Sequence, residues 1–423
     1  MAGFDNARAA NGIHDDLWSR CVIIDDGQTR LAMVAIDAIG FMNTEVEKIR
    51  KKLDSKLGIT YLVVASTHTH EAPDLMGLWG KTTLKSGVDR KYNDFVRAGI
   101  IRSVEVAVEN IRPVRLELSE DLHGADGLVN DTRKPEVFDN GIRVIRFIDR
   151  QSGKTNGSLI TWADHPEVLW GKNLLITSDY CHFLRDAVEN GVYATDGTKL
   201  AGGTGGIAVY FNGAIGGLMT TSPSLTVKDG MTGQEYKDPT FEKARALGST
   251  VAMIALKAME NPSEYVDSAK IGLVVARPVL PLDNKDFRLA KLFGIIKRKG
   301  GGLRRTFTEL AAFNIGPASF LTLPGEVYPE LVNGGIEAPE NNDFNIAPSE
   351  TPPLRDMMKG RFKFIIGLAN DEIGYILPKS QWDVEKPFTY GRKSSPYGEG
   401  NSLGPETARI LHDSIVLMLK KLN

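Results

Sequence analysis

Two histidines separated by one residue follow the most strand-like run of the chain. Residues 61–74 read Y-L-V-V-A-S-T-H-T-H-E-A-P-D, so His68 and His70 come after an apolar, β-branched stretch and before Pro73. In an extended segment residues i and i+2 point to the same face, so both imidazoles can enter one pocket. Imidazole binds metals and carries protons near neutral pH. The motif predicts a metal or catalytic site, although a pair of packed or surface histidines has the same spacing.

Three further strand-like runs end in residues that suit such a site. One leads into A-D-H-P with His165, another into P-G-E with Glu326, and a third into A-N-D-E-I-G-Y with Tyr375. Two imidazoles and one carboxylate form a known zinc ligand set of hydrolases, which leaves a position for water. Taken singly, P-G-E is most often a turn, and a tyrosine at a strand end most often packs with its hydroxyl bonded.

The segments that would position these residues alternate between strand and helix patterns. Strands are expected at 21–24, 31–36, 114–118, 142–148, 158–162, 207–211, 311–315, 318–323 and 362–368, besides the run that begins at 61. This alternation predicts an α/β fold, a layered sandwich of mixed β-sheets flanked by helices. In such folds sites gather at strand ends, which is where the histidines stand.

Helices are expected at 44–57, 92–111, 181–189, 239–259 and 405–422. Thr44 and Glu47 form a capping-box pattern at the start of the first. The buried stripes of the second and the last are predicted from their periodicity. They comprise Phe95, Ile100, Val104 and Val108 in one helix, and Ala408, Leu411, Ile415 and Met418 in the other.

Composition narrows the class of protein. The chain has 423 residues, 42% of them hydrophobic, with 51 Lys+Arg against 53 Asp+Glu. This balance gives no general attraction to nucleic acid, so we expect none as a partner. Cys21 and Cys181 alone cannot build a disulfide framework or a thiolate metal site. No run reaches the roughly 20 apolar residues of a transmembrane helix, and M-A-G-F-D-N is unlike a signal peptide. We expect a soluble chain as written, with one domain over 1–423.

Residues 284–305 form a basic, glycine-rich insertion in this pattern. Lys297-Arg298-Lys299 and Arg304-Arg305 flank three consecutive glycines. The flanking sequence is not basic and few aromatic residues interleave, so we expect a solvated loop rather than a patch for nucleic acid or lipid headgroups.

The ordered motifs of the chain resemble the catalytic domain of the neutral/alkaline non-lysosomal ceramidase family. The matching segments are G-I-H-D-D-L-W-S-R, A-S-T-H-T-H, V-N-D-T-R, A-D-H-P, T-S-D-Y, Y-F-N-G-A-I-G-G, L-P-G-E and G-L-A-N-D-E-I-G-Y. The family's enzymes are zinc amidases that cleave the N-acyl bond of ceramide. The resemblance implies that Zn²⁺ is held by His68, His165, Glu326 and Tyr375. It also implies that His70 and Arg133 contact the reacting carbonyl, with Tyr375 and Arg133 steadying the developing negative charge.

Some positions depart from the family pattern. Its enzymes follow T-H-T-H with S-G-P-G-G, where this chain has Glu71-Ala72-Pro73-Asp74, and its G-D-V-S-P segment is replaced by residues 216–220. Its ceramide enzymes carry a C-terminal immunoglobulin-like domain, which we do not expect within 1–423. They also begin with an extra strand, so the resemblance implies a secreted or periplasmic protein if an N-terminal signal has been removed.

Several polar residues are candidates to surround the ligands or to line the substrate. They are His14, Glu71, Asp74, Asp179 and Asn212. Asp179 is preferred to His182, because metal-bound imidazoles usually donate their second N–H to a carboxylate or carbonyl. His123 and His412 follow no apolar strand and are taken as ordinary residues.

The leading hypothesis is a zinc-dependent hydrolase that cleaves an amide or related acyl bond of a small or lipid-like substrate. A metal-dependent esterase or lactonase, and a non-catalytic binding protein, remain alternatives. Glu71 and Asp74 near the metal favour short or polar acyl compounds over long-chain ceramide, unless local backbone donors satisfy both carboxylates. The sequence gives no indication of oligomeric state.

Overall fold

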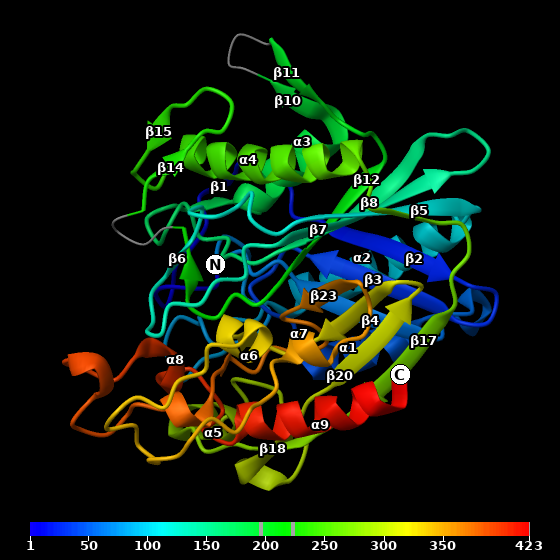
Figure 1. Cartoon of the computed structure of the whole chain (residues 1–423). Coiled ribbons are helices and arrows are strands. Elements are labelled where there is room, and N and C mark those ends of the chain that lie inside the picture. Colours follow the sequence, from blue (N-terminus) through cyan, green and yellow to red (C-terminus); the bar gives the residue numbers. More distant parts are fainter. Residues whose placement is uncertain (194–197, 221–224, 423) are drawn as a thin grey trace.

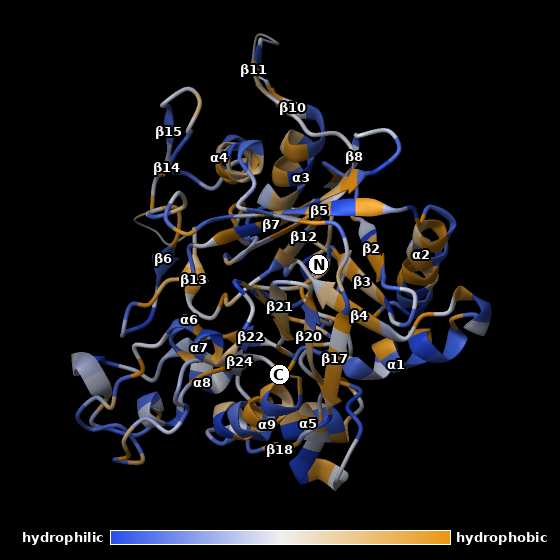
Figure 2. Ribbon diagram, turned by 45° about the vertical axis from the view of Figure 1, so that its right-hand side comes forward, coloured by the Kyte–Doolittle hydropathy of each residue, from blue (hydrophilic) through white to orange (hydrophobic). Residues whose placement is uncertain are grey.

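The computed structural model describes residues 1–193, 198–220 and 225–422, which form four layers of helices and sheets (Figure 1). Two inner layers of β-sheet face each other across an apolar core, and helices cover both outer faces. Figure 2 shows hydrophobic residues along strands such as β3 and β17, and hydrophilic residues in the outer loops. The predicted α/β sandwich with mixed sheets is confirmed.

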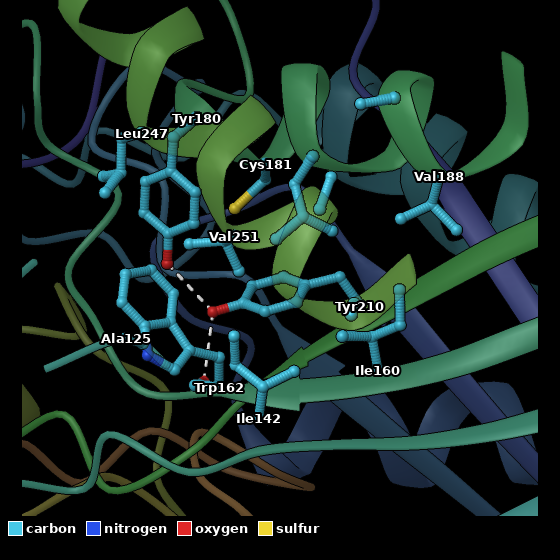
Figure 3. Close-up of a cluster of buried hydrophobic side chains, with 14 of the residues drawn as sticks. Ala125, Ile142, Ile160, Trp162, Tyr180, Cys181, Val188, Tyr210, Leu247 and Val251 are labelled. Atoms are coloured by element: carbon cyan, nitrogen blue, oxygen red, sulfur yellow. Dashed lines mark hydrogen bonds between the residues drawn. The ribbon is translucent and has the colours of Figure 1, made fainter. Parts of the chain in front are cut away.

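One inner layer is a five-stranded sheet. It consists, in order, of β12 (Ile207–Asn212), β8 (Thr155–Trp162), β7 (Ile142–Asp149), β5 (Val114–Asp121) and β16 (Glu264–Val266). Helices α3 (Tyr180–Asn190) and α4 (Phe241–Glu260) pack on its outer face. Figure 3 shows part of this contact, where the Tyr210 hydroxyl donates to the carbonyl oxygen of Trp162 at 3.1 Å. The Tyr180 hydroxyl lies 2.9 Å from that of Tyr210 and 3.0 Å from the carbonyl oxygen of Asp164. These bonds fix the end of β8, directly before His165.

The other inner layer combines two smaller sheets. The first has the order β2 (Ser19–Asp25), β3 (Arg30–Ile36) and β4 (Tyr61–Ser66), and the second has β17 (Ile271–Ala276), β20 (Leu310–Ile315), β21 (Ala318–Thr322) and β23 (Phe362–Ile366). The backbone N–H of Ser66 donates to Leu368 at 3.1 Å, and that of Asn370 donates to Val64 at 2.7 Å. These bonds place the segment that leads to Tyr375 beside the end of β4.

The outer helices of this layer are α1 (Asn43–Lys52) and α2 (Arg90–Glu109) over β3 and β4, and α9 (Thr407–Leu422) over β20, β21 and β23. The stripe predicted for α9 is buried. Shorter elements complete the fold: β1 (Gly12–Ile13), β6 (Asn130–Asp131), β9 (Leu175–Ile176), β10 (Gly191–Tyr193), β11 (Lys199–Gly202), β13 (Leu218–Met219), β14 (Val227–Lys228), β15 (Glu235–Tyr236), β18 (Val279–Pro281), β19 (Arg305–Phe307), β22 (Glu326–Val327), β24 (Tyr375–Ile376), α5 (Lys285–Leu292), α6 (Pro329–Asn333), α7 (Leu354–Met357) and α8 (Tyr397–Gly400). None of the helices in the described part of the chain combines the length and apolarity that a bilayer crossing requires.

Two helix predictions were wrong in detail. Helix α1 ends at Lys52, and its N-cap residue, Met42, makes no side-chain cap bond. The Thr44 hydroxyl instead donates to the carbonyl oxygen of Lys297 at 3.0 Å, so the capping-box prediction fails. In α2, Ile100 is fully buried but Phe95 is 72% exposed. Five residues correspond to a rotation of about 140° around a helix, which puts Phe95 on another face.

The insertion is not the loop that its composition predicted. Residues Lys285–Leu292 form α5, and Arg305–Phe307 form β19, which pairs with β18. The Asn284 side chain starts the helix by accepting hydrogen bonds from the backbone N–H groups of Asp286 and Phe287. The many basic residues could not distinguish this short helix from a loop, because they are as compatible with a helix as with a loop.

Candidate metal centre

His68 lies just beyond β4, where the chain leaves the sheet. Its φ of 74° is unusual for a residue with a side chain, and its backbone N–H donates to the carbonyl of Ala38 at 2.9 Å. The buried ring places Nδ1 2.5 Å from the carbonyl oxygen of Ile39. With Nδ1 bonded to a carbonyl, Nε2 is the nitrogen available to a ligand.

His165 is held in the same way beyond β8. Its Nδ1 lies 2.8 Å from the carbonyl oxygen of Leu218, and its Nε2 lies 2.9 Å from Oε2 of Glu326. Nε2 of His68 faces the same carboxylate oxygen at 3.6 Å. Two imidazoles, each oriented by a backbone carbonyl, therefore converge on one acidic oxygen.

Glu326 and Tyr375 reach this point from neighbouring strands. They are directly opposed in the parallel pair of β22 and β24. The Tyr375 hydroxyl lies 3.5 Å from Nε2 of His165, and its ring packs between those of Tyr328 and Tyr397, with centroids at 5.7 and 5.8 Å. The carboxylate and the phenol are both buried.

Asn212, at the end of β12, ties the two histidine segments together. Its Nδ2 donates to the carbonyl oxygens of Thr67 at 2.9 Å and of Asp164 at 2.8 Å. These residues directly precede His68 and His165. One buried amide therefore sets the distance between the two strand ends that carry imidazole.

His70 completes the group. The ligand atoms of His68, His70 and His165 all lie within 4.8 Å of one another. Neither ring nitrogen of His70 has a hydrogen-bond partner among the described residues. Two donor sets are thus available around one point: three imidazoles, or the imidazoles of His68 and His165 with the oxygens of Glu326 and Tyr375.

Burial and charge set the protonation of the group. Burial lowers the pKa of His68 to about 4 and that of His70 well below its usual value. Burial also opposes the charged form of His165, but the hydrogen bond and charge of Glu326 outweigh it and raise that pKa. Neutral imidazoles are the form that binds metal, so the pKa values of His68 and His70 suit ligation.

Comparison with known protein families and structures shows what the chain is related to. The model of the neutral/alkaline non-lysosomal ceramidase family, N-terminal part, matches residues 1–218, just over half of the chain. The chain belongs to the neutral/alkaline non-lysosomal ceramidase family. The resemblance seen in the sequence motifs is thereby confirmed. The matched part contains His68, His70, Arg133 and His165, whereas Glu326 and Tyr375 lie beyond it.

Two solved structures have the same fold. One is the neutral ceramidase of Pseudomonas aeruginosa, at 18% sequence identity and a TM-score of 0.73, with 99% of this chain and 71% of that chain covered. The other is a ceramidase complexed with C2, at 16% identity and a TM-score of 0.74, with 99% and 72% covered. At these identities the likeness extends to the fold alone.

Glu167 is a residue of the site that sequence reasoning missed. It stands two residues after His165 and is buried, and its Oε2 lies 3.4 Å from Nδ1 of His70. Its Oε1 has no hydrogen-bond partner within the described part of the chain. Burial raises its pKa to about 7. The H-P-E sequence at 165–167 was the signal that could have indicated Glu167, because an acidic residue two positions after a predicted ligand can lie on the same side of the chain as that ligand.

Arg133 lies one aromatic ring away from Tyr375. Its guanidinium pairs with Glu399, donates to the carbonyl oxygen of Gln381 at 2.7 Å, and lies over the Tyr328 ring at 5.2 Å from the centroid. That ring in turn packs against Tyr375. Nη1 of Arg133 has no partner among the described residues. The predicted contact of Arg133 with a substrate carbonyl stays a prediction.

Glu71 and Asp74, two departures from the family pattern, both point into the protein. Asp74 accepts hydrogen bonds from the backbone N–H groups of Met76, Gly77 and Trp79 at 2.7–2.9 Å. Glu71 is fully buried and pairs with Arg8. Burial raises the pKa of Glu71 to about 8 against the opposing charge of Arg8. Protein groups thus engage Asp74 and one oxygen of Glu71, while Oε1 of Glu71 has no hydrogen-bond partner among the described residues, which weakens the reason for expecting a polar substrate.

His14 and Asp179 lie at the starts of α4 and α3, respectively. The His14 ring stacks on Phe241 at 3.8 Å, and its Nδ1 lies 2.9 Å from Oδ2 of Asp15. Asp179 caps α3 by accepting from the backbone N–H of Tyr180 at 2.6 Å. His182, one third exposed, faces Asp15 at 3.7 Å. His123 is largely exposed, and His412 bonds to the carbonyl of Pro352.

Proposed function

We propose that this chain is a zinc-dependent hydrolase that cleaves the amide bond of N-acyl lipids. The observation that carries the proposal is the convergence of the His68 and His165 Nε2 atoms on Oε2 of Glu326, at 3.6 and 2.9 Å. A non-catalytic scaffold has no need of this arrangement, because burying such groups without a ligand is costly.

Zinc would be held by His68, His165, Glu326 and Tyr375. Nitrogen and oxygen donors of this kind suit zinc, and the carbonyls of Ile39 and Leu218 orient the two rings as bound imidazoles require. The chain's membership of the ceramidase family supports the same set of zinc ligands. When bound, zinc polarises a carbonyl oxygen and lowers the pKa of a coordinated water to about 7.

His70 is the group that would move protons. Its ring lies beside those of His68 and His165, at centroid distances of 4.9 and 6.1 Å, yet both of its nitrogens lack partners among the described residues. With Nδ1 facing Glu167, Nε2 would take a proton from the attacking water and deliver it to the leaving amine nitrogen. Glu167 would hold the tautomer that leaves Nε2 free to act.

Tyr375 would stabilise the negative charge that develops on the carbonyl oxygen, and Arg133 would support it indirectly. A phenol O–H aimed at that oxygen acts in a buried site, where a hydrogen bond to charge is strongest. Arg133 lies behind Tyr328, a position that favours holding the two tyrosines in place over direct contact with the substrate.

The experiment combines metal analysis with a substrate series. We expect about one zinc per chain, loss of turnover with a chelator, and recovery on adding zinc. Amides and esters with the same acyl groups, from short chains to long-chain ceramide, are then compared at fixed zinc by kcat/KM. Faster cleavage of the amides, with long chains preferred, supports the proposal. Absence of zinc together with indifference to chelators contradicts it, and faster ester cleavage makes the protein an esterase with the same centre.

A further inference from the structure

We propose that residues 279–307 bind the surface of an anionic lipid membrane. The binding follows from this segment alone, and only its benefit for catalysis rests on the proposed function. The segment comprises β18, α5, the glycine-rich turn and β19; β18 and α5 lie beside α9 in both views (Figures 1 and 2), and β19 pairs with β18.

Large apolar side chains of this segment face solvent. Leu289 and Leu292 of α5 are 51% and 55% exposed, and Phe293 is 62% exposed. Lys285, Leu289 and Leu292 are spaced i, i+4 and i+7, so they share one face of the helix. The exposed Phe307 stands opposite the exposed Val279 in the β18–β19 pair. Several large apolar side chains of the segment are therefore exposed to solvent, with Lys285 on the same helix face.

Cations without acidic partners surround these side chains. Asp283 and Asp286 are the only acidic residues of the segment, against eight basic ones. Arg298 pairs with Asp371 and Lys299 with Glu47. The remaining basic side chains form no ion pair within the described residues: Lys285, Arg288, Lys291, Lys297, Arg304 and Arg305. The segment therefore presents uncompensated positive charge.

The two kinds of side chain share one surface. A shallow depression of about 590 Å³ is lined by Lys291, Leu292, Lys297 and Leu303 together with the glycines. Cations next to apolar groups match the boundary between anionic headgroups and acyl chains. Nucleic acid would use the cations and the aromatic rings, but aliphatic side chains such as Leu292 offer no base stacking. The aliphatic content thus favours a membrane.

The inner face of the segment borders the candidate metal centre. Ile295 and Ile296 pack with Ile39 and Met76, and the carbonyl of Ile39 is the one that holds His68. The Phe287 ring lies close to Gly374, the residue before Tyr375, since a Cβ at that glycine would come within 3.7 Å of it. A membrane on the outer face would therefore be separated from the site by this segment. For a substrate that dissolves in lipid, membrane binding raises the local concentration near the metal.

Vesicle co-sedimentation tests the binding. The probe is phosphatidylcholine vesicles with and without about 30% phosphatidylserine, at low and high salt. We expect binding to the anionic vesicles that weakens with salt. Leu292→Ser with Phe293→Ser should lower the partition coefficient about tenfold or more. Replacing Lys297, Arg304 and Arg305 by Gln should lower it similarly. The matched controls are Phe95→Ser, at a residue 72% exposed on α2, and Gln at Lys51, Lys52 and Lys420.

Equal binding to both vesicle types, or equal losses in the controls, would overturn the proposal. Binding of an oligonucleotide that depends on Arg304 and Arg305 but not on Leu292 would overturn it in favour of nucleic acid. Turnover of a soluble short-acyl amide should not change in the segment variants. If vesicles bind but no amide is cleaved, the proposed function fails and the membrane surface stands.

Discussion

Two regions of this molecule differ in space and chemistry: a cavity along β2 and the candidate metal centre. A cavity of about 990 Å³ runs along β2 and is lined by every residue from Trp18 to Asp26, because the unpaired edge of that strand faces it. Its walls include the apolar side chains of Leu116 and Phe147. The candidate metal centre is much more tightly enclosed, yet it gathers the imidazoles, the carboxylates and the phenol. The large cavity and the reactive side chains lie in different places, so cavity volume alone would have indicated the wrong site.

The polar groups of the cavity along β2 and of the metal centre also differ. Around the cavity, Arg20 pairs with Glu189, and Arg150 with Asp267. At the metal centre, both nitrogens of His70 and an oxygen of Glu167 lack partners among the described residues. A buried polar atom without a partner costs about 1–3 kcal/mol. Single unpartnered atoms also occur elsewhere, Nε of Arg20 at the cavity among them, so the clustering of three such atoms on the neighbouring side chains of His70 and Glu167 is what indicates the metal centre.

The largest effect should come from removing a ligand. His68→Ala or His165→Ala should abolish zinc binding and lower kcat/KM by about 10³ or more, because metal and orientation are lost together. Zinc content and turnover are measured on the same preparations. His182→Ala, which removes an imidazole of α3 that is one third exposed, is the matched control. Equal zinc loss in that control would contradict the assignment.

His70→Ala separates the two donor sets. If His70 moves protons, zinc should remain near the wild-type content while kcat falls by about 10²–10⁴. Glu326→Gln should weaken zinc binding under the same conditions. Loss of zinc in His70→Ala, with retention in Glu326→Gln, would show that the three imidazoles bind the metal and that the division of roles is wrong.

Glu167→Gln tests whether the buried carboxylate positions His70. We expect kcat to fall about tenfold with unchanged KM and zinc content, because an amide orients the imidazole less well than a carboxylate. Glu330→Gln replaces a carboxylate that is as deeply buried but belongs to α6. A matching loss in that variant, or a change in KM instead of kcat, would assign Glu167 a structural role.

The sequence predicted the strand ends better than their surroundings. The short apolar runs before His68 and His165 are local features of the sequence, so β4 and β8 were foreseeable, and a strand end places its last residues at the sheet edge. The contacts around them are not local. Asn212 joins residues 145 and 48 positions away in sequence, and Arg8 neutralises Glu71 across 63 positions. Spacing cannot reveal partners that meet only after the sheets pack.

The smallest effect should come from filling the cavity along β2. Ile207→Trp adds bulk at a position 56% exposed that lines it, and surface substitutions of this kind change stability by about 0.5 kcal/mol or less. If catalysis depends on the metal centre alone, kcat/KM for short-acyl amide and for long-chain ceramide should both stay within about twofold of wild type. A selective loss with the long-chain ceramide would mean that its apolar chain uses this cavity, since each buried methylene is worth about 0.8 kcal/mol. The cavity along β2 and the metal centre would then bind the same substrate, and they could no longer be treated as separate regions.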